Sequence, residues 1–156
     1  MPKFFESWQK WKTYFVKTKP VEQIKPILPW PFRKIVIRIV PQSWMRPQYR
    51  DGYGDYWVDE KGTLQIAIRQ YDNPDFAFGC AIHELIEAWR CYKKGITLES
   101  IERWDDDHAD VDDPGRMPDA PYHFEHMQSM DIERLMCLQD GYSYDVYDDA
   151  KPIEGG

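Results

Sequence analysis

Five side chains able to carry out chemistry share one face of a helix predicted near the middle of the chain. At about 100° per residue they fall within roughly 100° of one another, and they are Cys80, His83, Glu84, Glu87 and Cys91. Because His83 and Glu87 are four residues apart, an imidazole nitrogen and a carboxylate oxygen can reach one metal ion at about 2 Å. Glu84 lies one step round the same face, where it can act on a water bound to that ion. The spacing predicts a zinc site with a base beside it.

The alternative is an amphipathic surface helix whose polar face carries histidine and glutamate by chance. Two cysteines on this face argue against it, since free cysteine is usually buried. The opposite face is apolar, which indicates a helix covered on both sides; it carries Phe78, Ile82, Leu85, Ile86 and Trp89.

The pentapeptide HELIE at residues 83–87 resembles the active-site helix of zincin metallopeptidases, H-E-x-x-H. The longer string HELIEAWRCYKKGI, followed by an acidic loop and by PYHFEH, is similar to a family of small metallopeptidase-like proteins of phages and prophages. This resemblance covers roughly residues 78–145. It implies that His83 binds zinc and that Glu84 is the general base. Glu87 departs from the zincin pattern, because it stands where the second histidine would be.

A third zinc ligand must come from later in the chain. Catalytic zinc usually has three protein ligands and one open position, and two histidines with one glutamate are a familiar set. His126 is the first choice, because it shares one stripe of the last predicted helix with Met130 and Glu133. Glu133 beside it can accept the other N–H of the His126 ring and so orient it.

Two other histidines stay open as the third ligand. His123 lies in the first turn of the last predicted helix and is the second choice. It is also predicted as a catalytic residue that polarises a carbonyl or stabilises an oxyanion. His108, in the preceding loop, is the third choice.

These residues predict a zinc-dependent metallohydrolase, a peptidase, that acts on a peptide or protein substrate. Zinc lowers the pKa of its bound water to about 7, and Glu84 takes the proton and later returns it to the leaving amine. The acidic segment 105–113 lacks the glycine and the terminal glutamate of an EF-hand loop, so we expect no calcium site there. If this segment lines the cleft, it favours basic peptides.

The whole chain predicts one α+β domain over residues 1–156, with a small antiparallel sheet packed on the active-site helix and on a C-terminal helix. Runs of β-branched residues between turn residues predict the strands, and helical patterns bounded by capping residues predict the helices. The elements in chain order are an N-terminal amphipathic helix over 4–17 with a Pro-rich connector to residue 31, strands within 33–69 (33–40, 54–58 and 63–69), the active-site helix over 75–94, an acidic loop over 105–120 and a C-terminal helix over 121–139.

Composition indicates a compact protein of a reducing compartment. With 156 residues, of which 42% are hydrophobic and 30% charged, the chain can bury a core without disulfides or a structural metal. Its three cysteines are too few and too scattered for a disulfide framework. We find no secretory signal and no apolar run near the roughly 20 residues that span a bilayer. We therefore expect a cytoplasmic protein without a membrane partner, in the host cytoplasm if a phage encodes it.

Charge is distributed unevenly and supports a different class of function. Residues 1–50 carry 11 Lys and Arg against 2 Asp and Glu, whereas residues 105–149 carry 2 Arg against 14 Asp and Glu. A basic segment rich in aromatic residues, 3–50, is typical of proteins that hold single-stranded nucleic acid. The alternative function is therefore a non-enzymatic protein that binds nucleic acid or another protein through this segment, with any metal structural. A zincin-like protein that has lost turnover is a third possibility.

Overall fold

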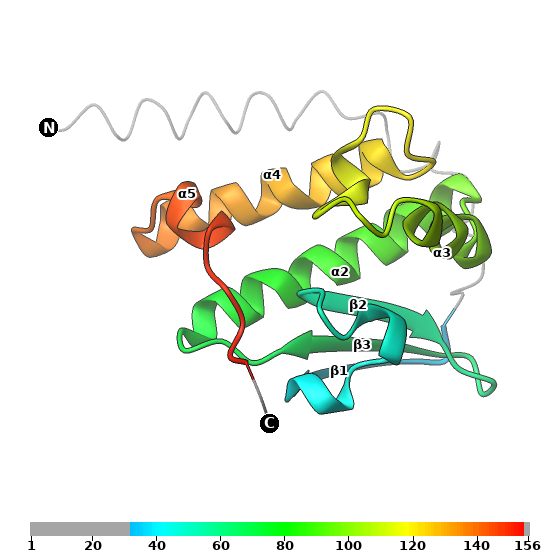
Figure 1. Cartoon of the computed structure of the whole chain (residues 1–156), viewed down its shortest axis with the longest axis horizontal. Coiled ribbons are helices and arrows are strands. Elements are labelled where there is room, and N and C mark those ends of the chain that lie inside the picture. Colours follow the sequence, from blue (N-terminus) through cyan, green and yellow to red (C-terminus); the bar gives the residue numbers. More distant parts are fainter. Residues whose placement is uncertain (1–31, 155–156) are drawn as a thin grey trace, which may run out of the picture. The chain divides into compact units, whose positions relative to one another are not determined.

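The computed structural model describes residues 32–154, which belong to one compact unit of residues 31–156 (Figure 1). Their helices and their small three-stranded sheet confirm the α+β class. The predicted helix over 4–17 and the connector to residue 31 lie outside the described residues, as does most of the basic segment 3–50. Among the helices that are described, none has the length and apolar character needed to cross a membrane.

The sheet consists of β1 (Lys34–Val40), β2 (Gly54–Val58) and β3 (Thr63–Arg69), in the order β1-β3-β2. The predicted hairpin is confirmed, because β2 and β3 pair antiparallel. The prediction of an antiparallel sheet is wrong for β1, which pairs parallel with β3. The segment 41–53 is long enough to place β2 two strands away from β1, and β3 then returns between them in the direction of β1.

Helix α2 (Pro74–Lys94) packs on the sheet and shares the main hydrophobic core with it. The side chain of Asn73 accepts a hydrogen bond from the N–H of Asp75 at 3.0 Å and so caps the helix N-terminus. The helix ends at Gly95, whose φ of +74° suits glycine. These limits agree with the predicted active-site helix. Three β3 side chains in this core are almost completely buried: Leu64, Ile66 and Ile68.

Helix α4 (His123–Asp140) covers α2 on the side away from the sheet, so the sheet, α2 and α4 form three layers (Figure 1). The sequence predicted α4 to within about two residues but missed α3 (Leu98–Asp107) and α5 (Tyr144–Asp148). The loop predicted over 105–120 therefore begins inside a helix. Thr97 caps α3 by accepting a hydrogen bond from the N–H of Ser100 at 3.2 Å.

Candidate metal centre

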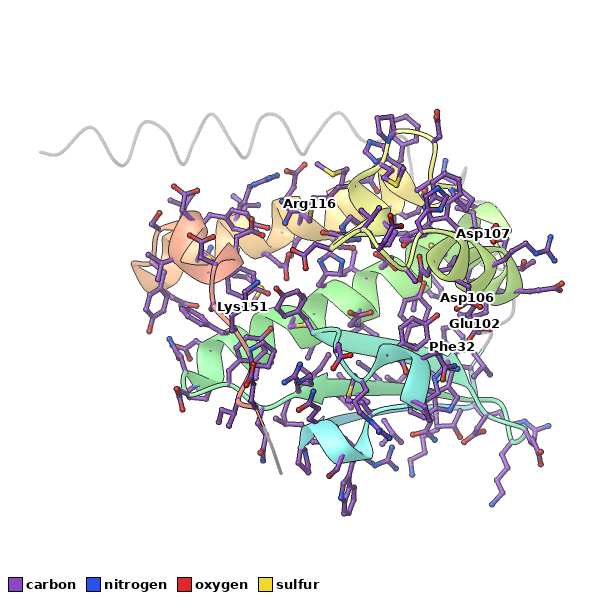
Figure 2. The ribbon with its side chains drawn as sticks, viewed as in Figure 1. Phe32, Glu102, Asp106, Asp107, Arg116 and Lys151 are labelled. Atoms are coloured by element: carbon purple, nitrogen blue, oxygen red, sulfur yellow. The ribbon has the colours of Figure 1, made fainter. Side chains whose placement is uncertain are left out.

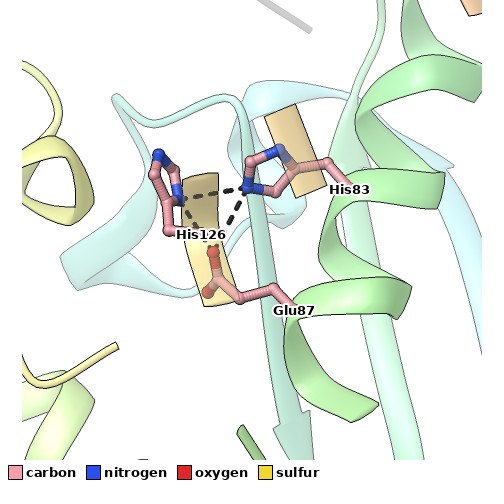
Figure 3. A group of neighbouring side chains, drawn as sticks. All are labelled: His83, Glu87 and His126. Atoms are coloured by element: carbon pink, nitrogen blue, oxygen red, sulfur yellow. Dashed lines mark hydrogen bonds and ion pairs between the residues drawn. The ribbon is translucent and has the colours of Figure 1, made fainter. Parts of the chain in front are cut away.

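Three buried side chains from two helices meet at one point, His83 and Glu87 from α2 and His126 from α4 (Figure 3). Nε2 of His83 lies 3.1 Å from Nδ1 of His126 and 3.2 Å from Oε2 of Glu87. Nδ1 of His126 lies 2.8 Å from the same Glu87 oxygen. Within residues 32–154, this is the one group of three or more His, Cys, Asp or Glu residues whose possible ligand atoms lie close enough together to hold a metal ion.

These three atoms fit a metal ion. Donor atoms bonded at 2.0–2.1 Å to a tetrahedral zinc ion lie about 3.3 Å from one another. The observed separations of 2.8 to 3.2 Å need to open by only a few tenths of an ångström. Two imidazoles and one carboxylate are the donor set of catalytic zinc sites, which keep a fourth position open, and also of mononuclear iron sites.

Each imidazole of the centre is held from behind by a second carboxylate. Nδ1 of His83 lies 3.0 Å from Oε2 of Glu133, and Nε2 of His126 lies 3.3 Å from Oδ2 of Asp113. A histidine that donates its outer N–H to a carboxylate keeps its other nitrogen available for a metal. Both outer hydrogen bonds therefore turn the inner nitrogens toward the same point.

Glu133 was expected beside His126, and the structure places it against His83 instead. The two helices run in opposite directions here, so the residue that lies two turns after His126 on α4 reaches the residue one turn before Glu87 on α2. The partner of His126 comes from the acidic loop, as Asp113.

Glu87 is ionised in this site although it is buried. Burial by itself raises the pKa of a carboxyl group, but hydrogen bonds from His126 and His83 outweigh it and bring the pKa of Glu87 to about 2. The hydroxyl of Tyr56, itself buried, donates to the other Glu87 oxygen, Oε1, at 3.3 Å. Tyr56 thus leaves Oε2 as the oxygen directed at the two imidazoles.

The two histidines carry extra protons in the metal-free protein. Burial lowers the pKa of His126, but hydrogen bonds to Asp113 and Glu87 more than compensate and bring it to about 9. The pKa of His83 is also raised: burial opposes the charged form, and Glu133 and Glu87 overcome that effect. An ion that enters the centre therefore replaces protons on the inner nitrogens.

A cavity of about 530 Å³ opens over the centre and has a strongly acidic wall. Ten of its lining residues are Asp or Glu, and three of these, Asp105, Asp112 and Asp113, come from the acidic segment 105–113. The lining contains one arginine and one lysine: Arg116, between α3 and α4, and Lys151, in the tail after α5, both labelled in Figure 2. The acidic segment therefore lines the cavity, which is the arrangement under which the sequence predicted a preference for basic peptides.

Glu84, the predicted base, lines this cavity next to the three ligand residues. Burial, and then repulsion from Glu87, raises the pKa of Glu84 to about 8. Its carboxyl group packs directly against Gly54 of β2, where an added Cβ would lie 2.9 Å from Cγ of Glu84. A glycine at this position lets the sheet edge approach the base closely.

The structure does not bring the other two candidate histidines to the centre. Nδ1 of His123 lies 3.1 Å from the carbonyl oxygen of Gly115, and His123 is absent from the described residues that line the cavity. His108 stacks on Trp104, and its Nδ1 lies 2.8 Å from that residue's carbonyl oxygen. The catalytic role predicted for His123 has no support in this geometry, because its ring fixes the loop before α4 instead.

Asp113 contributes to the centre although sequence reasoning gave it no role there, because it lies in the acidic loop and not on either predicted helix. The turn Pro114–Arg116 folds the loop back so that Gly115 lies against the His126 ring, where an added Cβ would be 2.7 Å from Cγ. The Pro-Gly pair after Asp113 is the one local signal of such a turn.

A scan against protein-family models, a search of curated proteins and a search of solved structures each found no match. The resemblance of residues 78–145 to small metallopeptidase-like phage proteins therefore stays a prediction.

Proposed function

We propose that this protein is a zinc-dependent metallohydrolase, a peptidase, in which His83, Glu87 and His126 hold the ion and Glu84 is the general base. The observation that carries the proposal is the pair of outer carboxylates, one behind each imidazole, while the inner donor atoms converge within 2.8 to 3.2 Å. Burying so many ionisable groups is costly unless they are paired or bind a metal. A chance surface pattern offers no compensation for that cost.

A zinc ion held by these residues would supply Lewis-acid activation of a water molecule and polarisation of an amide carbonyl. Glu84 accepts a proton from the water that attacks the amide carbon. The C–N bond then breaks, and the protonated Glu84 gives its proton to the leaving amine. A pKa of about 8 lies near neutral pH, which suits a group that both takes and returns a proton.

Peptides with basic side chains are the substrates that the cavity suits best. Asp105 is half-buried in the wall, and its carboxyl group accepts a hydrogen bond from the hydroxyl of Tyr122 at 2.6 Å. Burial raises the pKa of Asp105 to about 6, so the group is mostly ionised at pH 7. With Asp112 at the cavity rim, it offers negative charge to a lysine or arginine side chain.

Metal content and hydrolysis by matched variants test the proposal. Elemental analysis of protein purified without a chelator or metal-binding tag should find about one zinc per chain. His126→Ala should lose the metal, whereas His123→Ala, on the same helix, should keep it. Glu84→Gln should keep the metal and reduce cleavage of a basic peptide library by about 10²- to 10⁴-fold.

Other results would redirect the interpretation. Absence of stoichiometric metal from the wild type would overturn the proposal, and iron instead of zinc would leave the ligands and change the chemistry. Stoichiometric zinc without any cleavage would support a zincin-like protein that has lost turnover. Salt-dependent binding of single-stranded DNA by a metal-free, inactive wild type would support the binding function of segment 3–50.

The proposed location is a reducing cytoplasm. All three cysteines, Cys80, Cys91 and Cys137, are free and buried, which agrees with a compartment that keeps thiols reduced.

A further inference from the structure

The outer carboxylate of His83 is itself held by the C-terminal helix. Oε2 of Glu133 contacts Nδ1 of His83 at 3.0 Å, and Oε1 of the same group accepts a short hydrogen bond from the hydroxyl of Tyr147. Glu133 is 5% exposed, so water has little access to replace that hydroxyl. Tyr147 lies on α5. Within residues 32–154, no hydrogen bond or ring contact joins it to any of the three ligand residues.

The outer carboxylate of His126 is connected to the same helix. Nε of Arg116 donates to Oδ2 of Asp113 at 2.7 Å, and its guanidinium also pairs with Asp148, the last residue of α5. Both histidines of the centre are thus linked, through one carboxylate each, to adjacent residues of a five-residue helix. The link through Tyr147 is the more enclosed, because Arg116 and Asp148 are 44% and 34% exposed and such pairs contribute little.

Contacts outside the metal centre fix the position of α5. The ring of Tyr147 packs edge-on against Phe76, with ring centroids 5.4 Å apart. It also lies over Gly79 of α2, where an added Cβ would be 3.1 Å from the ring. After α5, the N–H of Ile153 donates to the carbonyl oxygen of Gln70 at 2.7 Å. Because α5 is anchored on α2 and at the end of β3, the hydroxyl of Tyr147 has a fixed position beside Glu133.

We propose that α5 positions the metal centre, with Tyr147 as a positioning residue that holds Glu133 so that His83 presents Nε2 to the ion. This inference rests on the proposed zinc site. A carboxylate fixed at both oxygens has one orientation, whereas a carboxylate fixed only by His83 can rotate and take the imidazole with it. Loss of partners of this kind typically weakens metal binding by about 10- to 100-fold.

Tyr147→Phe tests this role, and Tyr142→Phe is its matched control. Both tyrosines pack edge-on against Phe76, at 5.3 Å for Tyr142 and 5.4 Å for Tyr147. The hydroxyl of Tyr142 also donates to a carboxylate, that of Asp75, which is not linked to a histidine of the centre. The two variants therefore lose the same atom and the same kind of hydrogen bond.

The zinc dissociation constant of the full chain is measured by competition with a chromophoric chelator. We expect Tyr147→Phe to bind zinc about tenfold more weakly and Tyr142→Phe to bind as the wild type does. With Co²⁺ in place of zinc, the visible absorption bands should shift only in Tyr147→Phe. In a Glu133→Gln background, Tyr147→Phe should cause no further loss, since its effect passes through Glu133.

Several results would overturn the inference. Wild-type zinc affinity in Tyr147→Phe would do so and would leave the zinc site intact as a proposal. Equal weakening in both variants would show a general loosening of the tail rather than positioning. A full additional loss in the Glu133→Gln background would show that Tyr147 acts by another route. Absence of zinc binding by the wild type would overturn the proposed function and this inference together.

Discussion

Zinc binding should release protons, and the structure sets how many. The pKa of His126 is about 9 in the metal-free protein, so about 0.99 of this imidazole is protonated at pH 7, against about 0.24 for an ordinary pKa of 6.5. The pKa of His83 is raised as well. Because both inner nitrogens share one acceptor, Oε2 of Glu87, the pair holds between one and two extra protons.

These protons compete with the metal for the same nitrogens. Removing the proton of His126 at pH 7, two pH units below its pKa of about 9, costs about 3 kcal/mol and weakens binding by about 100-fold relative to a fully deprotonated imidazole. Between pH 6 and pH 8, zinc affinity should rise by about tenfold per pH unit for each proton released.

Calorimetry of zinc binding to metal-free protein, in buffers of different ionisation enthalpy, measures the proton count at pH 7. The observed enthalpy should vary linearly with the buffer enthalpy, and the slope should be at least one proton per zinc. His123→Ala should give the wild-type slope, because that ring lies outside the centre. A slope of zero with a pH-independent affinity would show neutral imidazoles and refute this reasoning.

Three further predictions concern close contacts and pH. Gly54→Ala places a methyl group 2.9 Å from Cγ of Glu84; zinc content should stay constant while peptide cleavage falls about 100-fold, and an unchanged kcat would contradict the placement of the base. Gly115→Ala places a methyl group 2.7 Å from Cγ of His126, so chelator competition should show zinc binding weakened by about tenfold or more, and wild-type affinity would count against His126 as a ligand. The metal-free protein should lose stability in thermal melts as the pH rises from about 6.5 to 9. The pKa values of His126 and Glu84 are raised to about 9 and about 8, so deprotonation of either group disfavours the folded state. A melting temperature that rises over this range would contradict that sign.

Local features of the fold were predictable because their causes lie within a few residues of one another. The hairpin of β2 and β3 follows from β-branched runs around a turn tetrapeptide, and α2 follows from Asn73, an apolar face and Gly95. The direction of β1 was not predictable in this way. Pairing of β1 with β3 joins residues that are almost thirty positions apart, such as Lys34 and Thr63, and no local pattern distinguishes parallel from antiparallel partners.

The same division applies to the metal centre. Helical geometry by itself places His83, Glu84 and Glu87 on one face, since the periodicity of a helix is set by its own backbone. His126 was preferred to His123 because it shares one stripe of the last helix with Met130 and Glu133. The structure places only His126 beside the pair from α2. Segments far apart in the sequence supply the rest: Asp113 comes from the acidic loop, and Tyr147 from a helix that the sequence did not predict.

The sequence by itself therefore determined which residue types lie together on one helix, and with them the proposed donor atoms and the proposed base. Only the tertiary structure decided which later histidine lies beside His83 and Glu87, which carboxylate contacts the outer nitrogen of each ring, and which residues line the cavity over the centre. The physical reason is distance along the chain. His126 lies 39 residues from Glu87 and 43 from His83, and contacts over such separations are set by packing of α4 on α2, not by any local preference of the backbone.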